Sequence, residues 1–272
     1  MAERVGFYKS TYGNFGAEVL AAVRAETYGR DIGQNSWLTA DEQERFGSFL
    51  NLAPGRRLLE VACGSGGPAL FLAETFGVSV EGIDVSEPGV AAANAAAMER
   101  GLTGIARFGV ADATRPLPFP DASFDAIQCI DAVNHLRDRA AVLAEWRRVL
   151  RPDGLLLYTD PIVVTGVLTS DEIATRSSIG LFLFVPDGEN QRLLRDAGFR
   201  LVRHEDVTDN EVLTSARWIA ARERHRDDLI AIEGADTYMG TQDFLQTVHA
   251  LSASRRLSRH LFVAQRSSEG AR

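Results

Sequence analysis

Short apolar runs alternate with helical patterns through the middle of the chain, and this alternation predicts an α/β fold. The runs are rich in Leu, Val and Ile, as in parallel strands covered on both faces, and they begin near residues 58, 78, 106, 124 and 155. Helices are expected between them. A helix at residues 189–197 that Gly198 ends, and strands at 199–207 and 260–266, are predicted to follow.

Helical patterns also lie outside this core, in two segments that are distant in sequence. Residues 15–28 and 40–50 are predicted helices, and Thr39 with Glu42 forms the capping signal of the second. A long helical insertion, residues 208–258, precedes the final strand, and insertions of this size are usually functional lids. The domains we expect are an N-terminal helical cap, a core, a helical lid and a final strand with tail, at residues 1–52, 53–208, 209–258 and 259–272.

A turn of small residues joins the first strand to its helix within residues 58–73, LLEVACGSGGPALFLA. Residues 64–67 leave space that larger side chains would fill, and Glu60 adds an acceptor at the end of the strand. Pro68 fits the first turn of the helix, where its missing N–H costs no hydrogen bond. This turn predicts a cofactor site, but its glycine spacing also matches a dinucleotide fingerprint.

Carboxylates follow the next two strands. Asp84 ends the second strand, about 20 residues past the first glycine of the turn, where an acid can accept hydrogen bonds from both ribose hydroxyls. Asp112 follows the third strand at the same edge of the sheet and is well placed to meet an adenine amino group. An NAD(P)-dependent oxidoreductase is an alternative, but it leaves Asp112 and the proline-broken loop at 116–120 unexplained.

With these features, residues 57–164 resemble the class I S-adenosylmethionine-dependent methyltransferases. The resemblance implies an α/β, Rossmann-like, seven-stranded and mostly parallel sheet with an antiparallel last strand, covered by the helical cap and the lid. It implies S-adenosylmethionine as cofactor and a small-molecule metabolite, such as a natural product, that is methylated on oxygen or nitrogen. A protein of this fold that uses the cofactor without methyl transfer is a further alternative.

The resemblance also implies cofactor contacts. Glu60 and the glycine turn would hold the methionine part, Asp84 the ribose, and Asp112 with the Ala113 amide the adenine, while residues 129–131 would close over the sulfonium. The family usually has glycine where this chain has Ala62, so we expect Ala62 either to keep an ordinary backbone conformation or to distort the turn. The cofactor residues expected are Tyr28, Gln34, Ser36, Trp37, Glu60, Ala62, Gly64, Gly66, Asp84, Val85, Asp112, Ala113, Cys129, Ile130, Asp131 and His135.

Two residues at the carboxyl edge of the sheet are candidates for the catalytic base, His135 and Asp160. An imidazole with its ordinary pKa of about 6.5 can accept a proton at neutral pH, and a nearby carboxylate can orient it. Similar small-molecule methyltransferases have a histidine and an acid at these positions. A structural histidine at a helix start, and an aspartate that suits a turn before Pro161, are the alternatives.

Aromatic and apolar side chains of the cap are the candidate substrate walls, with a structural role in the cap core as the alternative. They are Phe182, Phe184, Trp218, Tyr238, Met239 and Phe244. In similar methyltransferases the loop at residues 33–39, GQNSWLT, folds over the amino-acid end of the cofactor, and capping the next helix is its other interpretation. Tyr28 is equally open to both interpretations.

The net charge of −8 argues against a nucleic-acid substrate, because no cationic surface is available to replace phosphate counterions. We expect Arg222, Arg224 and Arg226 to lie on a solvated helix face. Cys63 and Cys129 should form no disulfide, no metal site is expected, and the first residues lack a secretory signal. These observations predict a cytoplasmic protein without a membrane partner, with a homodimer as one possible assembly.

Overall fold

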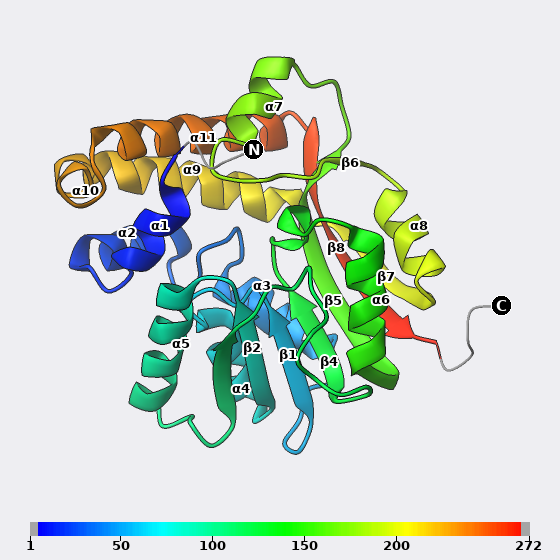
Figure 1. Cartoon of the computed structure of the whole chain (residues 1–272). Coiled ribbons are helices and arrows are strands. Elements are labelled where there is room, and N and C mark those ends of the chain that lie inside the picture. The colour runs from blue at the N-terminus through cyan, green and yellow to red at the C-terminus, as the bar shows by residue number, and fades with distance from the viewer. Residues whose placement is uncertain (1–4, 268–272) are drawn as a thin grey trace.

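One sheet forms the centre of the computed structural model, which describes residues 5–267 (Figure 1). Its strands follow the order β3-β2-β1-β4-β5-β8-β7, and β6 pairs with β5. β8 is antiparallel to β5 and β7, whereas the pairs among β1 to β5 are parallel, so the expected mostly parallel sheet with an antiparallel last strand is confirmed. The sheet has eight strands and not the expected seven, because the two-residue β6 is added beside β5. The strands are β1 Arg57–Val61, β2 Ser79–Asp84, β3 Ala106–Val110, β4 Phe124–Cys129, β5 Leu150–Val164, β6 Val185–Pro186, β7 Phe199–Asp206 and β8 Leu257–Arg266.

Helices cover both faces of this sheet, because side chains alternate along each strand. Leu58 packs into the core beneath α3, α4 and α5, and Leu59 packs into the core beneath α6 and α8. These strands are buried on both sides, as parallel strands usually are. The core helices are α3 Ala40–Ser48, α4 Gly67–Phe76, α5 Glu87–Glu99, α6 Arg139–Val149 and α8 Glu189–Asp196, with the 3₁₀ turn η1 at Val133–His135.

A second group of helices lies over one end of the sheet (Figure 1). α9 and α11 pack against each other, α2 packs against α9, and their shared core includes Trp37, Trp218 and Leu245. Segments from the two ends of the chain thus build one cap with its own apolar interior. The cap helices are α1 Phe7–Gly13, α2 Glu18–Tyr28, α7 Ser170–Arg176, α9 Thr208–Arg224, α10 Arg226–Glu233 and α11 Ala235–Ala253.

The N-terminal helices differ partly from the prediction. The predicted helix at 15–28 begins only at Glu18, and α1 precedes it as a separate short helix. α1 spans 7 residues, too few for the periodicity of a helix to emerge from the sequence. The Thr39 cap is confirmed, since its side chain accepts a hydrogen bond from the backbone N–H of Glu42 at 3.4 Å.

The fifth strand does not end at Asp160, as predicted, but continues to Val164. The pairing of β5 with β8 shifts between Asp160 and Val163, and Pro161 lies within this irregularity, where a missing N–H is tolerated. The Asp160 carboxylate accepts a hydrogen bond from the Ile162 N–H at 3.3 Å and supports the backbone there. Asp160 therefore lies inside a long strand and not at its exposed end.

A buried ion-pair cluster ties the cap to the sheet. Arg259 of β8 donates from Nε to Asp131 and from Nη1 to Glu42 of α3, both at 2.7 Å. Asp131 also accepts from the Trp37 N–H at 3.0 Å and from the Thr159 hydroxyl at 2.7 Å. Three buried charges with several hydrogen bonds fix where the loop carrying Trp37 crosses the sheet edge.

Two expectations about side chains have opposite outcomes. Cys63 and Cys129 are both free and buried, which agrees with the expected absence of a disulfide between them. Arg222 is not on a solvated face, because it is buried between α9 and the next helices, where it pairs with Glu233 and donates to Gln242.

Among the described residues, no helix is both long enough and apolar enough to cross a membrane.

Candidate active site

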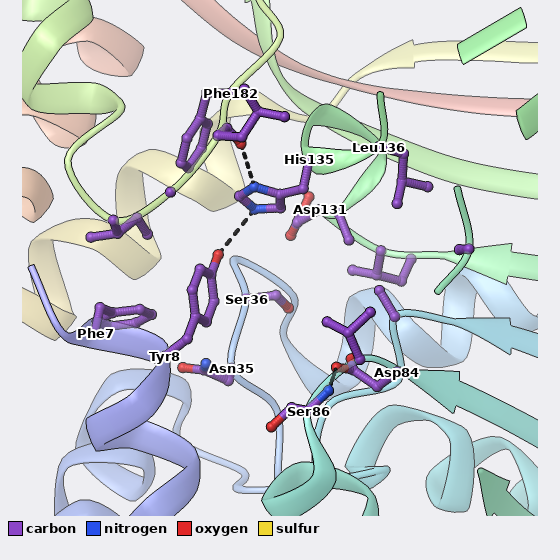
Figure 2. Close-up of a pocket in the computed structure, with 18 of the residues that line it drawn as sticks. Phe7, Tyr8, Asn35, Ser36, Asp84, Ser86, Asp131, His135, Leu136 and Phe182 are labelled. Carbon is purple, nitrogen blue, oxygen red and sulfur yellow. Dashed lines mark hydrogen bonds between the residues drawn. The ribbon is translucent and has the colours of Figure 1, made fainter. Parts of the chain in front are cut away.

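A cavity of about 460 Å³ lies between the carboxyl ends of the parallel strands and the cap. Figure 2 shows His135 and Phe182 on one side of it and Asp84 with Ser86 on the other. A narrower extension reaches the glycine turn and is lined by Glu60 and Gly64. The two hollows are adjacent, because they share the lining residues Tyr12, Asn35, Ser36, Ala62 and Ile130.

The glycine turn leaves room for a neighbouring aromatic residue from the cap. A Cβ atom on Gly64 would lie 2.4 Å from the Tyr12 hydroxyl, so only glycine allows α1 to approach this closely. Gly66 has φ 77° and packs against Ala93 and Phe108, which gives it a packing role outside both hollows. Ala62 has φ 58°, in the left-handed region that favours glycine, so it does not keep the ordinary backbone conformation that was one of the two expected outcomes.

Asp84 and Asp112 both line the main cavity but in different surroundings. Asp84 accepts from the N–H groups of Gly64 and Ser86 at 2.8 Å each, and burial raises its pKa. Asp112 is much more exposed and accepts from the N–H and hydroxyl of Thr114, which lower its pKa. Asp84 is therefore held rigidly beside the glycine turn, whereas Asp112 lies at the rim.

Glu60 is a buried acid without a cationic partner in the part of the chain that the structure describes. Its relative exposure is 3%, and Gln128 donates to it at 3.0 Å. Burial raises its pKa to about 8, because no nearby cation offsets the loss of water. At that pKa the Glu60 carboxyl is mostly neutral at pH 7, and a positively charged ligand group in the adjacent extension of the cavity would favour its ionised form.

His135 and Tyr8 form a hydrogen-bonded pair at the cap side of the cavity (Figure 2). The Tyr8 hydroxyl lies 3.0 Å from His135 Nε2, and His135 Nδ1 lies 2.7 Å from the carbonyl oxygen of Leu181. A carbonyl can only accept, so Nδ1 carries the proton and Nε2 accepts from Tyr8. Burial lowers the pKa of His135 to about 4, and the imidazole is neutral at pH 7.

The other candidate base, Asp160, lies outside the cavity. It is fully buried and accepts from Arg139 at 2.6 Å and from Asn190 at 2.9 Å. Arg139 also donates to Asn190 and to the carbonyl oxygen of Leu183. The carboxylate therefore belongs to a structural ion pair that holds the segment after α7 against the sheet, and the sequence expectation of Asp160 as a base is corrected.

The loop before α3 splits into lining and structural residues. Asn35, Ser36 and Trp37 line the main cavity. The Gln34 side chain instead binds the backbone of its own loop, accepting from the Ile32 N–H at 2.8 Å. Tyr28 is buried and donates to the Ser36 carbonyl oxygen at 2.7 Å, so it supports the loop from behind. Neither Gln34 nor Tyr28 lines either hollow, which corrects the expectation that they contact the cofactor.

The residues expected after the fourth strand separate in the same way. Ile130 and Asp131 line the main cavity, as do Val85 and Ala113. Cys129 is fully buried beneath them and lines neither hollow, which corrects its expected contact with the cofactor. Burial raises the pKa of both cysteine thiols, so neither is prepared as a nucleophile.

Three of the six expected substrate walls line the cavity: Phe182, Trp218 and Phe244. The other three do not, and those expectations are corrected. Tyr238 is buried in the cap core, Phe184 packs beside Leu251, and Met239 faces solvent at 52% exposure. Helical spacing shows that such residues share a face, but it does not show which face meets the cavity.

Sequence reasoning missed lining residues at the sheet edge, such as Ser86, Thr114 and Leu136, and several from the cap: Phe7, Tyr8, Tyr12, Arg176, Ile179 and Gly180. A signal existed for the tyrosines, because Tyr8 and Tyr12 are four residues apart and so lie on one helix face. Arg176 had no such signal, since it ends a short polar helix whose sequence suggests exposure. Its burial at 1% exposure follows only from the packing of the cap.

One group of three side chains in residues 5–267 has the spacing of metal ligands, although the sequence suggested no metal site. It consists of Asp187, His204 and His260, whose ligand atoms all lie within 4.8 Å of one another. His204 Nε2 and His260 Nδ1 lie 3.0 Å apart and share a hydrogen bond. The group lies outside the cavity, and we assign it no role in the site.

The lining fits the cofactor implied by the sequence. S-adenosylmethionine combines a ribose and an adenine with an ammonium group and a sulfonium, and both of these groups carry positive charge. Three carboxylates, Glu60, Asp84 and Asp112, converge on the adjacent hollows, and the first of them lacks a cation. The glycine turn lies beside Asp84, and a Cβ atom on its Gly64 would clash with Tyr12.

Comparisons with known proteins agree with this site. A family model described as a methyltransferase domain matches residues 59–158. The 27-O-demethylrifamycin SV methyltransferase of Amycolatopsis mediterranei is 36% identical over 184 residues, which are 66% of this chain and 66% of that protein. Phosphoethanolamine N-methyltransferase 3 of Arabidopsis thaliana is 31% identical over 82% of this chain but only 45% of its own length.

The fold has solved counterparts. The cyclopropane synthase MmaA2 from Mycobacterium tuberculosis superposes with a TM-score of 0.82 at 18% identity, covering 97% of this chain and 100% of that chain. At this identity the match concerns the fold alone. The sheet order, the glycine turn, the carboxylates and the sequence relatives lead to one conclusion: the chain belongs to the class I S-adenosylmethionine-dependent methyltransferases.

Proposed function

We propose that this protein transfers a methyl group from S-adenosylmethionine to an oxygen or nitrogen of a small-molecule metabolite. One observation carries the proposal: Glu60, a buried acid with no cationic partner among the described residues, and two further acids line one side of a cavity whose other side presents the Tyr8–His135 pair. Two relatives are named as methyltransferases of 27-O-demethylrifamycin SV and of phosphoethanolamine, and these names support a small-molecule acceptor.

The chain's residues divide the work of holding the cofactor. Asp84 would accept from the ribose hydroxyls, Asp112 and the Ala113 amide would meet the adenine, and Glu60 would face the ammonium group beside Gly64. When bound, S-adenosylmethionine supplies an activated methyl group for an in-line displacement. Val85, Ile130 and Asp131 complete the lining around it.

Tyr8 and His135 are placed to remove the acceptor's proton. The Tyr8 hydroxyl donates its own proton to His135 Nε2, and a phenolic oxygen, which has two lone pairs, can accept a hydrogen bond from an acceptor O–H or N–H in the cavity. A proton can then move from the acceptor to Tyr8 Oη while the tyrosine proton moves to Nε2. Such general-base assistance contributes roughly 10²- to 10⁴-fold to a rate, and the lowered pKa of His135 makes this imidazole a weaker base than an ordinary one.

Positioning contributes more than the base does. Phe182 lies with its ring centroid 4.5 Å from that of His135, and Trp218 and Phe244 continue the apolar wall into the cap. Aligning two reactants in a dry, shaped site can lower a barrier by roughly 7–11 kcal/mol. The cap is therefore the part of the molecule that selects the acceptor and excludes water.

A binding and turnover experiment tests the proposal. The protein is titrated with S-adenosylmethionine and with NADH by calorimetry, then incubated with S-adenosylmethionine and a panel of hydroxylated and amino metabolites. We expect saturable binding of the sulfonium compound, no binding of NADH, and release of S-adenosylhomocysteine. Binding of NADH alone would favour an oxidoreductase. Binding of S-adenosylmethionine with unchanged cofactor for every acceptor would favour a scaffold role.

The proposal extends to the surroundings of the protein. A cytoplasmic location is supported by the two unpaired cysteines, and the net charge of −8 supports a protein without nucleic-acid or membrane partners. A homodimer stays a prediction, which sedimentation of the purified protein tests.

A further inference from the structure

Arg176 is a buried cation that forms no ion pair with any residue in the described range 5–267. It ends α7 at 1% exposure and lines the cavity. No hydrogen bond or ion pair joins its guanidinium to another described residue, and its buried Nη1 atom has no partner. Five N–H donors in a planar fork are thus held at the edge of the cavity. Burying a charge in this way is costly unless a partner arrives.

The surroundings of Arg176 orient it without neutralising it. Its guanidinium carbon lies 4.6 Å from the ring centroid of Phe182 and 5.0 Å from that of Phe244. These rings attract a cation but accept no ordinary hydrogen bond. Burial lowers the pKa of Arg176, as expected of a charge that has lost water without gaining a counter-ion.

The nearest acids do not supply a counter-ion. Glu211 has the largest favourable electrostatic effect on Arg176, yet it makes no ion pair with it and accepts instead from Ser252 at 3.0 Å. Burial raises the pKa of Glu211 to about 8, so this acid is mostly neutral at pH 7. Asp131 and Asp160 are occupied by Arg259 and Arg139.

Arg176 lies at the acceptor end of the cavity. Its partner Phe182 packs against His135, whereas Asp84 binds Gly64 of the cofactor turn. A group bound by Arg176 would therefore belong to the molecule that also meets Tyr8 and His135. The wall around it is aromatic, which leaves Arg176 as the charged contact that the cap presents to an acceptor there.

We propose that Arg176 binds an anionic group of the methyl acceptor, a carboxylate or a phosphate, and so selects acidic acceptors. This inference rests on the proposed function, because it assigns the acceptor class for the same site. The guanidinium fork matches either anion through two parallel hydrogen bonds. The rings of Phe182 and Phe244 hold the fork in place before the ligand binds.

Matched ligand pairs test the inference by binding. Protein loaded with S-adenosylhomocysteine is titrated calorimetrically with hydroxylated aromatic acids, with their primary amides, and with the corresponding phosphonates. We expect at least one acid or phosphonate to bind about ten- to hundredfold more tightly than its amide, the size of a charge-assisted pair of hydrogen bonds. The carboxylate and phosphonate arms identify which anion is preferred. Equal affinities throughout the panel overturn the inference.

The variant Arg176→Met gives the second arm. We expect it to abolish the preference for the acid, to bind S-adenosylhomocysteine with unchanged affinity, and to melt no lower than wild type, because an unpaired buried charge has been removed. Arg222→Met is the matched control, since Arg222 is equally buried but paired with Glu233. It should melt lower and keep the preference.

Three further outcomes test the inference or the proposed function on which it rests. If Arg176→Met loses affinity for S-adenosylhomocysteine and not for the acid, Arg176 serves the cofactor and the inference is overturned. If Arg176→Met does not fold, Arg176→Gln, which also removes the charge, replaces it, and an undiminished acid-to-amide ratio then overturns the inference. If wild-type protein does not bind S-adenosylhomocysteine, the proposed function itself fails, which separates the two failures.

Discussion

The Tyr8 hydroxyl and His135 Nε2 lie 3.0 Å apart although 127 residues separate them in sequence. One residue comes from the first helix of the cap and the other from the turn after β4. The Leu181 carbonyl fixes the protonated nitrogen of the imidazole as Nδ1, so the pair has one direction of proton transfer. The site is therefore complete only when the cap lies over the sheet.

Removing either partner of this pair should slow turnover. His135→Asn and Tyr8→Phe are each expected to reduce kcat about 10²- to 10⁴-fold, because the acceptor proton loses its path, while calorimetric affinity for S-adenosylhomocysteine stays unchanged. Tyr28→Phe is the matched control: it deletes a buried hydroxyl that donates to the Ser36 carbonyl oxygen and does not line the cavity, so it should keep wild-type kcat. Wild-type kcat in both His135→Asn and Tyr8→Phe would remove the pair from the mechanism.

The lowered pKa of His135 predicts how stability depends on pH. The folded pKa of about 4 lies below the ordinary value of 6.5, so the unfolded chain binds more protons between these values. The free energy of unfolding should therefore fall as the pH falls from 6.5 towards 4. The imidazole is partly accessible from the cavity, so solvent reduces this effect below the limit of about 3 kcal/mol.

Urea titrations of wild type and His135→Asn at several pH values measure the effect as a difference, which cancels the other titrating groups. The free energy of unfolding of wild type, minus that of His135→Asn, should decrease as the pH is lowered from 7 to 4. A constant difference across that range would show that His135 titrates normally.

Asp84 and Asp112 should contribute unequally to cofactor binding. Asp84→Asn is expected to weaken S-adenosylmethionine binding by about 1.5–3 kcal/mol, because a buried acceptor of the ribose is lost. Asp112→Asn should weaken binding less, because the Asp112 carboxylate is more exposed and water competes there for its hydrogen bonds. Calorimetry gives both dissociation constants. A larger loss for Asp112→Asn would contradict the placement of the ribose at Asp84.

The buried cluster around Arg259 should govern stability. Arg259→Met leaves Glu42 and Asp131 buried without their cation and is expected to lower the free energy of unfolding by about 3–5 kcal/mol. Arg45→Met removes an exposed pair with Glu205 and should change it by no more than about 1 kcal/mol. Urea denaturation measures both, and similar effects of the two changes would refute the tie between cap and sheet.

A larger side chain at Gly180 would fill the part of the cavity beside Tyr8 and His135 without reaching the cofactor side. A Cβ atom there would lie 3.8 Å from the Tyr8 ring and 4.0 Å from His135 Nδ1, which is ordinary contact, so Gly180→Ala should be tolerated. Gly180→Val adds two methyl groups beside the pair and is expected to lower kcat/KM for bulky acceptors without changing S-adenosylhomocysteine affinity. Unchanged kcat/KM in the valine variant would place the acceptor elsewhere.

Much of the cofactor side was predictable because it is local in sequence. The strand, the glycine turn and the helix at 58–73 are consecutive, and Asp84 follows the next strand, so a parallel arrangement brings them to one edge. Ala62 shows the limit of this reasoning: the sequence left its backbone conformation open, and in the structure it lies in the left-handed region.

By itself, the sequence determined the α/β alternation, the order of the motifs and the carboxylates that follow the strands, because these depend on neighbouring residues. The tertiary structure decided which side chains contact one another across the cap and the sheet. Asp160 was placed with Arg139 and not in the cavity, Tyr8 was brought to His135, and Arg176 was buried against two rings. Such choices depend on how distant segments of the cap pack, since the free energy of a buried charge is set by whichever groups surround it.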